Sequence, residues 1–326
     1  MSAHATGAPR HALRRPVGAG LEAGACGRML LFGAGGFLGG HVWGQAAERG
    51  VEVVTASRSA LPASGDHRRG DLSTCTVDEL AALVADVAPD VVVNCAGATG
   101  GGVEELAATN VTGVAHLAGA LLASGAPCRL VHVGSAAEYG ASEWGTAVDE
   151  SAPARPVGPY GATKLAGTKL VELAAAAGLE AVVLRVFNPV GPGAPPTSLL
   201  GRLVGELRRA APGGAPVHLG PLDAVRDFVD VRDVADAVLA ASAAPVPAHR
   251  VLNVGSGQGV AVRELVKRLV ALAGCVASVE EDAPASERSP QVMWQQADVA
   301  LAARELCWRP WRSLEHSLVD CWEEDR

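Results

Sequence analysis

The sequence predicts an α/β protein with a doubly wound parallel sheet and a smaller C-terminal α/β lobe. Short apolar segments of strand length alternate with helical segments of about 10 to 15 residues between positions 29 and 188, which is typical of a parallel sheet with helices on both faces. A glycine-rich turn follows the first apolar segment. The alternation stops after Asn188 at the sequence NPVGPGAPP, whose prolines and glycines predict a loop at the boundary of the second lobe.

The individual elements are expected in this order. Residues 1–28 lack helical and strand periodicity and predict a disordered tail. Strands are then expected at 29–34, 51–56, 90–95, 129–135 and 180–187, and helices from the glycine turn to 49 and at 77–87, 107–128 and 162–177. Beyond Asn188 we expect a strand near 217, a strand and helix within 227–241, a strand at 251–254, a helix at 262–273 and a last helix from Ser313.

Charge and cysteine content exclude several classes of protein. The 326 residues carry a net charge of −8, which opposes binding to a nucleic-acid backbone. The seven cysteines never form a C-x-x-C pair, which predicts free thiols rather than a disulfide framework or a metal site. The chain starts without the apolar core of a secretory signal, and the uncharged stretch 107–128 contains Asn110 and three glycines. We therefore expect a cytoplasmic protein with no membrane span.

The glycine-rich turn has the spacing of a dinucleotide-binding loop. Gly33, Gly36 and Gly39 stand directly after the first strand and open the first helix, with Phe37 and Leu38 between them. Glycines are needed there because a Cβ would keep the pyrophosphate away from the helix N-terminal amides. The pattern alone is weak in a chain with 39 glycines, but its position between a strand and a helix predicts a Rossmann-type cofactor site.

The residues after the second strand favour NADP over NAD. An NAD enzyme tends to have an acidic residue there for the ribose 2′-hydroxyl, whereas this chain has Ser57 and Arg58, and an arginine can pair with a 2′-phosphate. The alternative is a solvated arginine, so NAD remains possible. Asp71 and Leu72 follow where a third strand would end, and Asp71 could accept a hydrogen bond from the adenine amino group or simply form a turn.

A catalytic group is predicted from rare residues. The chain has two tyrosines and three lysines, and Tyr160 precedes Lys164 by four residues, which puts both on one face of a helix. An ammonium beside a phenol favours the phenolate, so the pair can transfer a proton near neutral pH. Ser135 ends a parallel strand, where its hydroxyl would reach the ligand crevice and hold a carbonyl oxygen. The alternative is a surface Tyr and Lys on an amphipathic helix.

These motifs together resemble the extended short-chain dehydrogenase/reductases of the NAD-dependent epimerase/dehydratase family, which act on nucleotide sugars. The resemblance runs from about Met29 to Trp311. It is strongest to reductases of GDP-4-keto-6-deoxymannose, through the segments GSAAEYG and LDAVRDFVDVRDVADAV. Its other motifs are GAGGFLG, NCAG, TNVTG, PYGATK, RVFNPVGP and LNVGSG.

The resemblance implies a role for each matching residue. Ser135, Tyr160 and Lys164 would be catalytic. Tyr160 and Lys164 would also contact the cofactor, and Ala96 in NCAG would line it. The predicted substrate-binding residues are Ser135, Ala136, Asn188, Arg226 and Arg288, although either arginine could instead form an internal salt bridge. The implied organisation is a dinucleotide-binding domain at 29–188, a substrate-binding lobe at 189–326 whose segment 226–254 returns to the core, and a homodimer formed by the 107–128 and Tyr160 helices.

Departures from the family patterns narrow the reaction. Dehydratases have acidic residues directly after the catalytic Ser/Thr, but this chain has Ala136 and Ala137, which cannot move protons. The sequence therefore predicts an NADPH-dependent 4-ketoreductase of a dTDP- or GDP-linked 4-keto-6-deoxyhexose, in deoxysugar biosynthesis. A nucleotide-sugar 4-epimerase with tightly bound NAD is the first alternative, followed by a 4,6-dehydratase and a dinucleotide-sensing binding module. Pro189 stands where the most similar reductases have a histidine-type residue, so the orientation of the sugar is left open.

Overall fold

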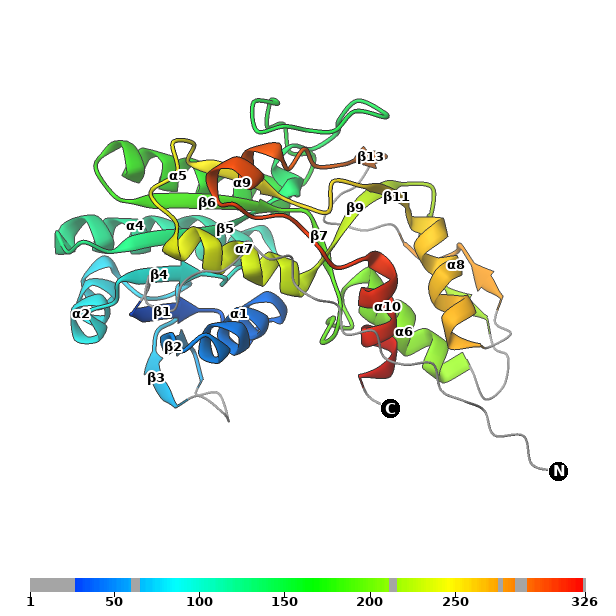
Figure 1. The fold of residues 1–326 in the computed structure, drawn as a ribbon, viewed down its shortest axis with the longest axis horizontal. Coiled ribbons are helices and arrows are strands. Elements are labelled where there is room, and N and C mark those ends of the chain that lie inside the picture. Colours follow the sequence, from blue (N-terminus) through cyan, green and yellow to red (C-terminus); the bar gives the residue numbers. More distant parts are fainter. Residues whose placement is uncertain (1–26, 60–64, 211–215, 275–277, 285–291, 325–326) are drawn as a thin grey trace.

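The computed structural model describes residues 27–59, 65–210, 216–274, 278–284 and 292–324. Of the predicted tail only Gly27 and Arg28 belong to these ranges, and Arg28 already begins the first strand. The predicted substrate contact Arg288 lies outside them. Figure 1 shows the central sheet with its covering helices on one side of the molecule and the C-terminal lobe on the other.

The central sheet has seven strands, all parallel, in the order β10-β6-β5-β4-β1-β2-β3 (Figure 1). Their bounds are β1 Arg28–Phe32, β2 Glu52–Ser57, β3 Asp66–Arg69, β4 Val91–Asn94, β5 Arg129–Ser135, β6 Ala181–Val186 and β10 Val251–Val254. The strand order reverses between β1 and β4, and in sheets of this kind ligands bind in the crevice outside the carboxyl ends of the strands at that point. The predicted doubly wound Rossmann-type fold is confirmed.

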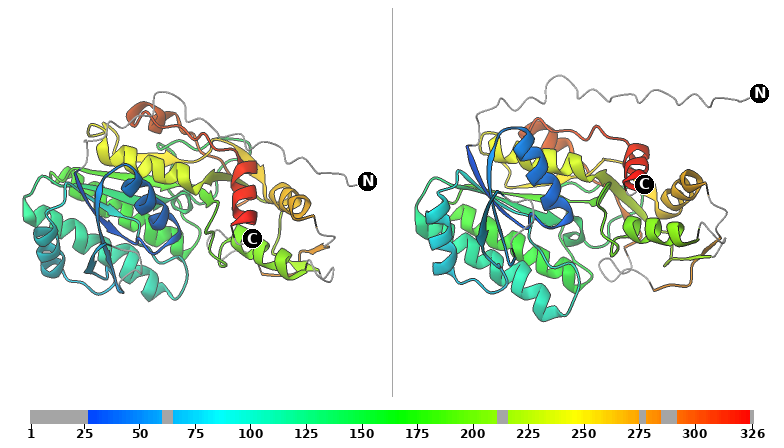
Figure 2. Two further views of the ribbon diagram at one scale, coloured as in Figure 1. Left: turned by 60° about the horizontal axis from the view of Figure 1, so that its bottom comes forward. Right: turned by 90° about the horizontal axis from the view of Figure 1, so that it is seen from below.

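Helices cover both faces of this sheet, as the views in Figure 2 show. On one face lie α1 (Phe37–Glu48) and α7 (Val231–Ala243), and on the other α2 (Val77–Val87), α4 (Gly113–Ser124) and α5 (Pro159–Ala176). Alternate residues of each strand serve the two faces: Leu31 of β1 packs in the α1/α7 core, whereas Leu30 packs in the α2/α4/α5 core. Double burial explains why β1 and β4 are apolar between their ends, whereas the edge strand β3 is polar.

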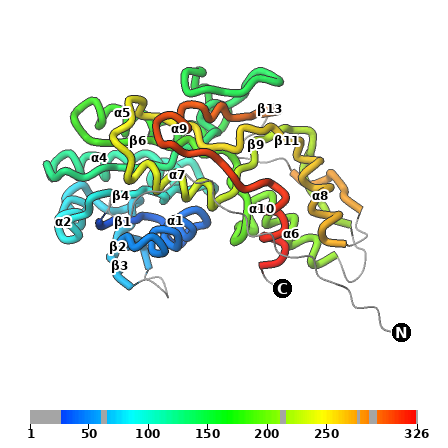
Figure 3. The backbone as a smooth tube through the Cα atoms, viewed as in Figure 1, coloured from blue at the N-terminus to red at the C-terminus, as the bar shows by residue number. Residues whose placement is uncertain are grey.

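The C-terminal lobe is built around β9 (Val225–Asp230), which pairs with β7 (Asn188–Val190), β11 (Gly259–Ala261) and β13 (Trp294–Gln295). Its remaining elements are α6 Leu199–Ala210, α8 Val262–Ala273, α10 Leu314–Glu323, β8 Val217–His218 and β12 Val279–Glu280. A separate apolar core holds these elements together. The tube in Figure 3 shows the chain returning from β9 through α7 to the central sheet, where α9 (Ala300–Glu305) packs against β10.

Two predicted helices have other bounds than expected. The helix predicted at 107–128 is split into α3 (Val103–Ala107), a π-helical turn η1 (Ala108–Thr112) and α4, and it ends at Ser124 because Gly125 takes a left-handed conformation with φ 58°. Helix α5 begins three residues earlier than predicted, at Pro159, because proline fits the first helical position. Among the described residues only 103–124 is long and apolar enough to cross a membrane; it packs between α2 and α5.

Asp227 connects the lobe to the central sheet. Its fully buried carboxylate accepts hydrogen bonds from the main-chain N–H groups of Ser256, Gly257 and Ala297, at 2.6, 2.9 and 3.1 Å, and from the Ser256 hydroxyl at 2.7 Å. Burial raises the pKa of this carboxyl, and the four donors act against that shift. The site-facing strand β9 is thus fixed to the loop that follows β10.

Asp227→Asn should lower the free energy of unfolding by about 3 kcal/mol, because an amide NH₂ would face main-chain donors and leave them without an acceptor. Urea denaturation measures the change. Asp149→Asn is the matched control, since Asp149 accepts hydrogen bonds from Ser151 in an exposed turn. Equal unfolding free energies for the two variants would contradict the assigned role of Asp227.

Candidate active site

The glycine loop between β1 and α1 has the geometry of a phosphate cradle. Gly33 has φ +81°, and a Cβ there would lie 2.6 Å from the Ala96 nitrogen at the end of β4. A Cβ at Gly39 would collide with the Gly33 carbonyl oxygen, so α1 can approach the loop only with glycine. The loop therefore brings the ends of β1 and β4 and the start of α1 together.

The start of α1 is suited to an anion. Gly36 is the N-cap residue with no side-chain cap, and the first turn contains no acidic residue, so no side chain caps the N-terminal amides. A Cβ on Gly36 would stand 3.3 Å from the Gly33 carbonyl oxygen. Phe37 and Leu38 follow in the first turn, Phe37 edge-on to His41 and Leu38 against the α1/α7 core. This cradle fits a dinucleotide pyrophosphate.

The residues predicted to bind adenosine lie at the ends of β2 and β3. Ser57 ends β2 and donates from its hydroxyl to the Ser59 carbonyl at 2.6 Å, and Arg58 is exposed next to it. The Asp71 Oδ1 accepts hydrogen bonds from the Ser73 amide and hydroxyl, which gives Asp71 the turn role noted as its alternative. Leu72 is buried at this turn.

Arg69 is a second cation at this corner, and no role was predicted for it. It pairs in register with Ser57 and is exposed. Its neighbour Arg68, by contrast, is bound by Asp66 and Asp86. The segment DHRR has no apolar alternation, so no strand was predicted there. The only indication in the sequence that Arg69 lies near the adenosine site was its position two residues before Asp71.

The three predicted catalytic residues come from β5 and α5. Ser135 is the last residue of β5, and its Oγ accepts a hydrogen bond from the Ala137 amide at 3.2 Å. A Cβ on Gly161 would lie 2.5 Å from the Ala137 carbonyl oxygen, so the start of α5, with the half-buried Tyr160, packs directly against the turn after Ser135. One turn further along α5, the Lys164 ammonium donates to the Val133 carbonyl at 2.6 Å.

The Lys164 ammonium is buried beside the cofactor loop. Burial lowers its pKa below the usual value, and the Glu138 carboxylate acts in the opposite direction. Burial and the Lys164 charge also hold the pKa of His132 well below its usual value, so this histidine is neutral. A Cβ on Gly97, in the loop after β4, would be 3.7 Å from the Lys164 nitrogen, which puts the ammonium at the edge of the predicted nicotinamide site.

Asn110 is a further polar residue of this region, and no role was predicted for it. It lies in the π turn η1, where its Nδ2 donates to the Ala98 carbonyl at 2.9 Å and to the Thr163 hydroxyl at 3.1 Å. Its Oδ1 accepts from the Ala98 amide at 3.0 Å. Asn110 therefore fixes the loop after β4 to α5 directly before Lys164. An amide side chain inside an apolar helix was the feature of the sequence that could have indicated this role.

The predicted substrate residues lie around the same carboxyl ends. Ala136 is buried in the turn after Ser135, and Asn188 begins β7, where its Nδ2 donates to the Asp227 carbonyl at 2.9 Å. Arg226 on β9 is buried, and its guanidinium donates to the main-chain carbonyls of Val225 and Val292 at 2.9 and 2.6 Å. Burial lowers the pKa of Arg226 to about 10.

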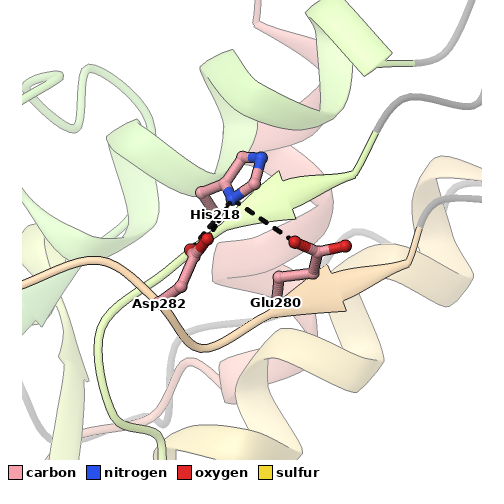
Figure 4. A group of neighbouring side chains, drawn as sticks. All are labelled: His218, Glu280 and Asp282. Carbon is pink, nitrogen blue, oxygen red and sulfur yellow. Dashed lines mark hydrogen bonds and ion pairs between the residues drawn. The ribbon is translucent and has the colours of Figure 1, made fainter.

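Two other polar regions lie away from this site. A cleft of about 890 Å³ beside the edge strand β10 is lined by charges of both signs and by none of the predicted site residues. In the lobe, the exposed His218 lies 2.9 Å from both Asp282 oxygens and 3.7 Å from Glu280 (Figure 4). These are residue types that bind metals, but Asp282 raises the His218 pKa, so a surface ion pair accounts for the cluster.

Comparison with known proteins agrees with this geometry. The sequence profile described as the NAD dependent epimerase/dehydratase family matches residues 29–255, which include the glycine loop, Ser135, Tyr160 and Lys164. The chain belongs to the NAD-dependent epimerase/dehydratase family. The resemblance stated from the motifs is thereby confirmed.

Individual members of the family are similar over nearly the whole chain. A dTDP-6-deoxy-L-talose 4-dehydrogenase (NAD(P)(+)) of Kitasatospora kifunensis is 40% identical over 90% of this chain and 94% of its own length. A UDP-glucose 4-epimerase of Streptomyces lividans is 32% identical over 91% of this chain and 95% of its own length. The solved structure of MoeE5 with UDP-glucuronic acid and NAD has a TM-score of 0.81 and 31% identity, covering 92% of this chain and 99% of that one.

Membership makes the protein an NAD(P)-dependent enzyme that modifies nucleotide sugars, as the sequence predicted. The finer features do not follow from the family, because its members differ in them. Membership does not determine the cofactor preference, the nucleotide, the sugar or the role of each site residue.

Gly36→Ala should weaken dinucleotide binding about tenfold or more, because the added methyl group would stand over the helix amides that the pyrophosphate needs. A fluorescence titration with NADPH measures the affinity. Gly44→Ala, in an exposed position of α1 with no heavy atom near its Cβ, is the matched control. It should leave the affinity unchanged and raise stability by about 0.5 to 1 kcal/mol. Unchanged binding in Gly36→Ala would contradict the cradle.

Proposed function

We propose that the protein is an NADPH-dependent 4-ketoreductase of a dTDP-linked 4-keto-6-deoxyhexose, acting in deoxysugar biosynthesis. The observation that carries the proposal is the combination of Ser135, Tyr160 and Lys164 with Ala136 and Ala137 at the crevice. Support for dTDP comes from the dTDP-6-deoxy-L-talose 4-dehydrogenase at 40% identity, because a 4-dehydrogenase run in reverse is a 4-ketoreductase. A GDP-linked sugar is the second substrate to test.

The three residues of the proposed catalytic group have different tasks. Bound NADPH supplies the hydride that the C4 carbonyl carbon takes up. The Ser135 hydroxyl donates a hydrogen bond to the carbonyl oxygen, and Tyr160 gives its phenolic proton to the alkoxide that develops there. Lys164 favours the phenolate that Tyr160 becomes and donates to the ribose of the cofactor; one of its three N–H groups is already on the Val133 carbonyl.

Elimination of water is not supported by the residues after Ser135. A 4,6-dehydratase needs an acid and a base beside the sugar, whereas Ala136 and Ala137 have only methyl side chains, and the Ala137 amide is bound to the Ser135 hydroxyl. The next carboxylate, Glu138, is fully buried and pairs with Arg185. It therefore does not reach the crevice as an acid or base.

Substrate anchoring is proposed for Arg226 and Asn188. Both lie on lobe strands next to the carboxyl ends of the central sheet. The main-chain carbonyls of Val225 and Val292 accept hydrogen bonds from the Arg226 guanidinium and fix its plane, and a fixed planar guanidinium suits a nucleoside diphosphate. Arg288, which lies outside the described residues, remains a proposed second contact to the diphosphate.

A 4-epimerase with tightly bound NAD is the second candidate. The observation in its favour is the Streptomyces lividans relative at 32% identity, together with a catalytic group that a 4-epimerase also needs. Such an enzyme recycles the hydride and consumes no cofactor. The exposed arginines at the ends of β2 and β3 support the reductase, because they favour NADPH that is exchanged at each turnover.

A homodimer is proposed through α4 and α5, which lie side by side on one face of the sheet. Each of these helices has an exposed leucine: Leu122 is 38% and Leu173 is 68% accessible. Exposed apolar side chains on adjacent helices support an interface between two copies of the chain.

Incubation with NADPH and a dTDP-4-keto-6-deoxyhexose should oxidise the cofactor, measured by the loss of NADPH absorbance. Tyr160→Phe should lower kcat about 1,000-fold while binding NADPH normally, because only the proton donor is removed. No oxidation with either the dTDP or the GDP sugar would refute the ketoreductase. Release of NAD on denaturation, with C4 epimerisation of a UDP- or dTDP-hexose, would establish the epimerase instead.

Arg58→Ala and Arg69→Ala should each weaken NADPH binding about 10- to 100-fold and leave NADH binding unchanged, because each removes a charge-assisted hydrogen bond to the 2′-phosphate. Parallel titrations with NADPH and NADH measure the two affinities. Arg68→Ala on the same strand is the matched control, since Asp66 and Asp86 hold that guanidinium. Equal losses for both cofactors would argue against an NADP preference.

A further inference from the structure

Glu138 lies in the turn that follows Ser135. Residues Ala136–Glu138 form a single 3₁₀ turn, η2, which folds the chain back so that the Glu138 side chain enters the interior below the end of β5. The side chain is completely buried. A buried carboxylate at this position needs hydrogen-bond donors and a positive charge around it.

Three donors surround this carboxylate. Its Oε1 accepts from the Ser135 main-chain N–H at 2.8 Å and from the Thr168 hydroxyl of α5 at 2.9 Å. Its Oε2 accepts from Nε of Arg185 on β6 at 2.8 Å. The main chain of Ser135 is therefore bound by a buried carboxylate, and the Ser135 hydroxyl is bound to the turn itself through the Ala137 amide.

Arg185 is fixed in turn. It stands opposite Gly134 in the β5–β6 register, and its guanidinium lies 4.6 Å from the centre of the Tyr139 ring. The Tyr139 hydroxyl donates to Asn253 on β10 at 2.7 Å. Gly134 leaves the space that the carboxylate fills, because a Cβ there would lie 2.7 Å from the Glu138 Oε1. The arrangement extends from β10 to the catalytic serine.

We propose that Glu138, held by Arg185, is a positioning residue that fixes the Ser135 main chain and thereby the direction of the Ser135 hydroxyl toward the substrate carbonyl. The inference rests on the proposed function. Replacing a buried ion pair by apolar residues of similar volume is often neutral for stability, so packing alone does not explain the pair. What an apolar pair would lack is an acceptor for the Ser135 N–H. An ionised acceptor does hold a main-chain N–H more strongly than a neutral one.

Two double variants separate the hydrogen bond from the ion pair. Glu138→Gln with Arg185→Met removes the charges but keeps an acceptor for the Ser135 N–H. Glu138→Leu with Arg185→Met removes the charges and also the acceptor for the Ser135 N–H. We expect the first variant to keep kcat within about fivefold of the wild type and the second to lose about 100-fold, with NADPH affinity unchanged in both, because a shift of about 1 Å in a catalytic group has that effect.

Equal kcat in the two double variants would overturn the proposal, whether both are low or both are high. Asp233→Asn, which disturbs the buried Asp233–Arg312 pair away from the crevice, is the control for a general loss of stability and should keep its kcat. If the double variants do not fold, Gly134→Ala tests the same point, since its methyl group displaces the carboxylate. A wild-type kcat in folded Gly134→Ala would equally overturn the proposal.

Amide hydrogen exchange gives a readout that does not depend on activity. The Ser135 amide should be protected in the wild type and in the Gln/Met variant and should exchange at least about tenfold faster in the Leu/Met variant, because its acceptor is gone. An inactive wild type with this pattern would refute the proposed reaction but not the positioning role. Equal protection in all three proteins would refute the positioning role alone.

Discussion

Burial of the central strands on both faces is the constraint from which the site follows. Strands β1, β4 and β6 are buried between their ends because helices cover both sides, and their residues there are apolar except for Arg185 of β6, which is itself buried. Exposed polar groups of these strands are therefore confined to their ends. The carboxyl ends all meet at one edge because the strands are parallel. Ser135, the glycine loop and Asn188 are therefore brought together by the direction of the chain, although up to 155 positions separate Gly33 from Asn188.

The buried polar residues of the central sheet hold main-chain groups near the carboxyl ends of its strands. His132 on β5 accepts a hydrogen bond from Asn94 on β4 in its neutral form, and the Asn94 Oδ1 in turn accepts the Ala96 amide of the cofactor loop at 3.0 Å. One strand further, Arg185 and Glu138 neutralise each other below Ser135. Each of these two polar groups thus holds one main-chain N–H at the carboxyl edge of the sheet, that of Ala96 after β4 and that of Ser135 at the end of β5.

The fold could be predicted, and Tyr160 and Lys164 could be singled out as candidates, because both inferences depend on short-range patterns. Apolar segments of strand length, the glycine spacing and the i, i+4 relation of Tyr160 and Lys164 are all visible within a few residues. Strand β3 could not be predicted, because a polar edge strand such as DHRR has no apolar face. Helix α6 was missed although it is amphipathic, since it follows a proline-rich loop and contains two glycines. Contacts such as Glu138–Arg185 depend on strand register, which no local pattern reveals.

The π turn at Ala108–Thr112 has a consequence for the two helices it joins. A π turn holds one more residue than an α turn, so it rotates everything after it by about 100° relative to an uninterrupted helix. The apolar side of α4 and the amide of Asn110 can therefore face different groups: α4 packs on α2, α5 and the sheet, while Asn110 donates to the Ala98 carbonyl in the loop after β4 and to the Thr163 hydroxyl. Because of the inserted residue, the apolar side chains of α4 can point into the core while Asn110 of the same helical segment points toward the loop after β4.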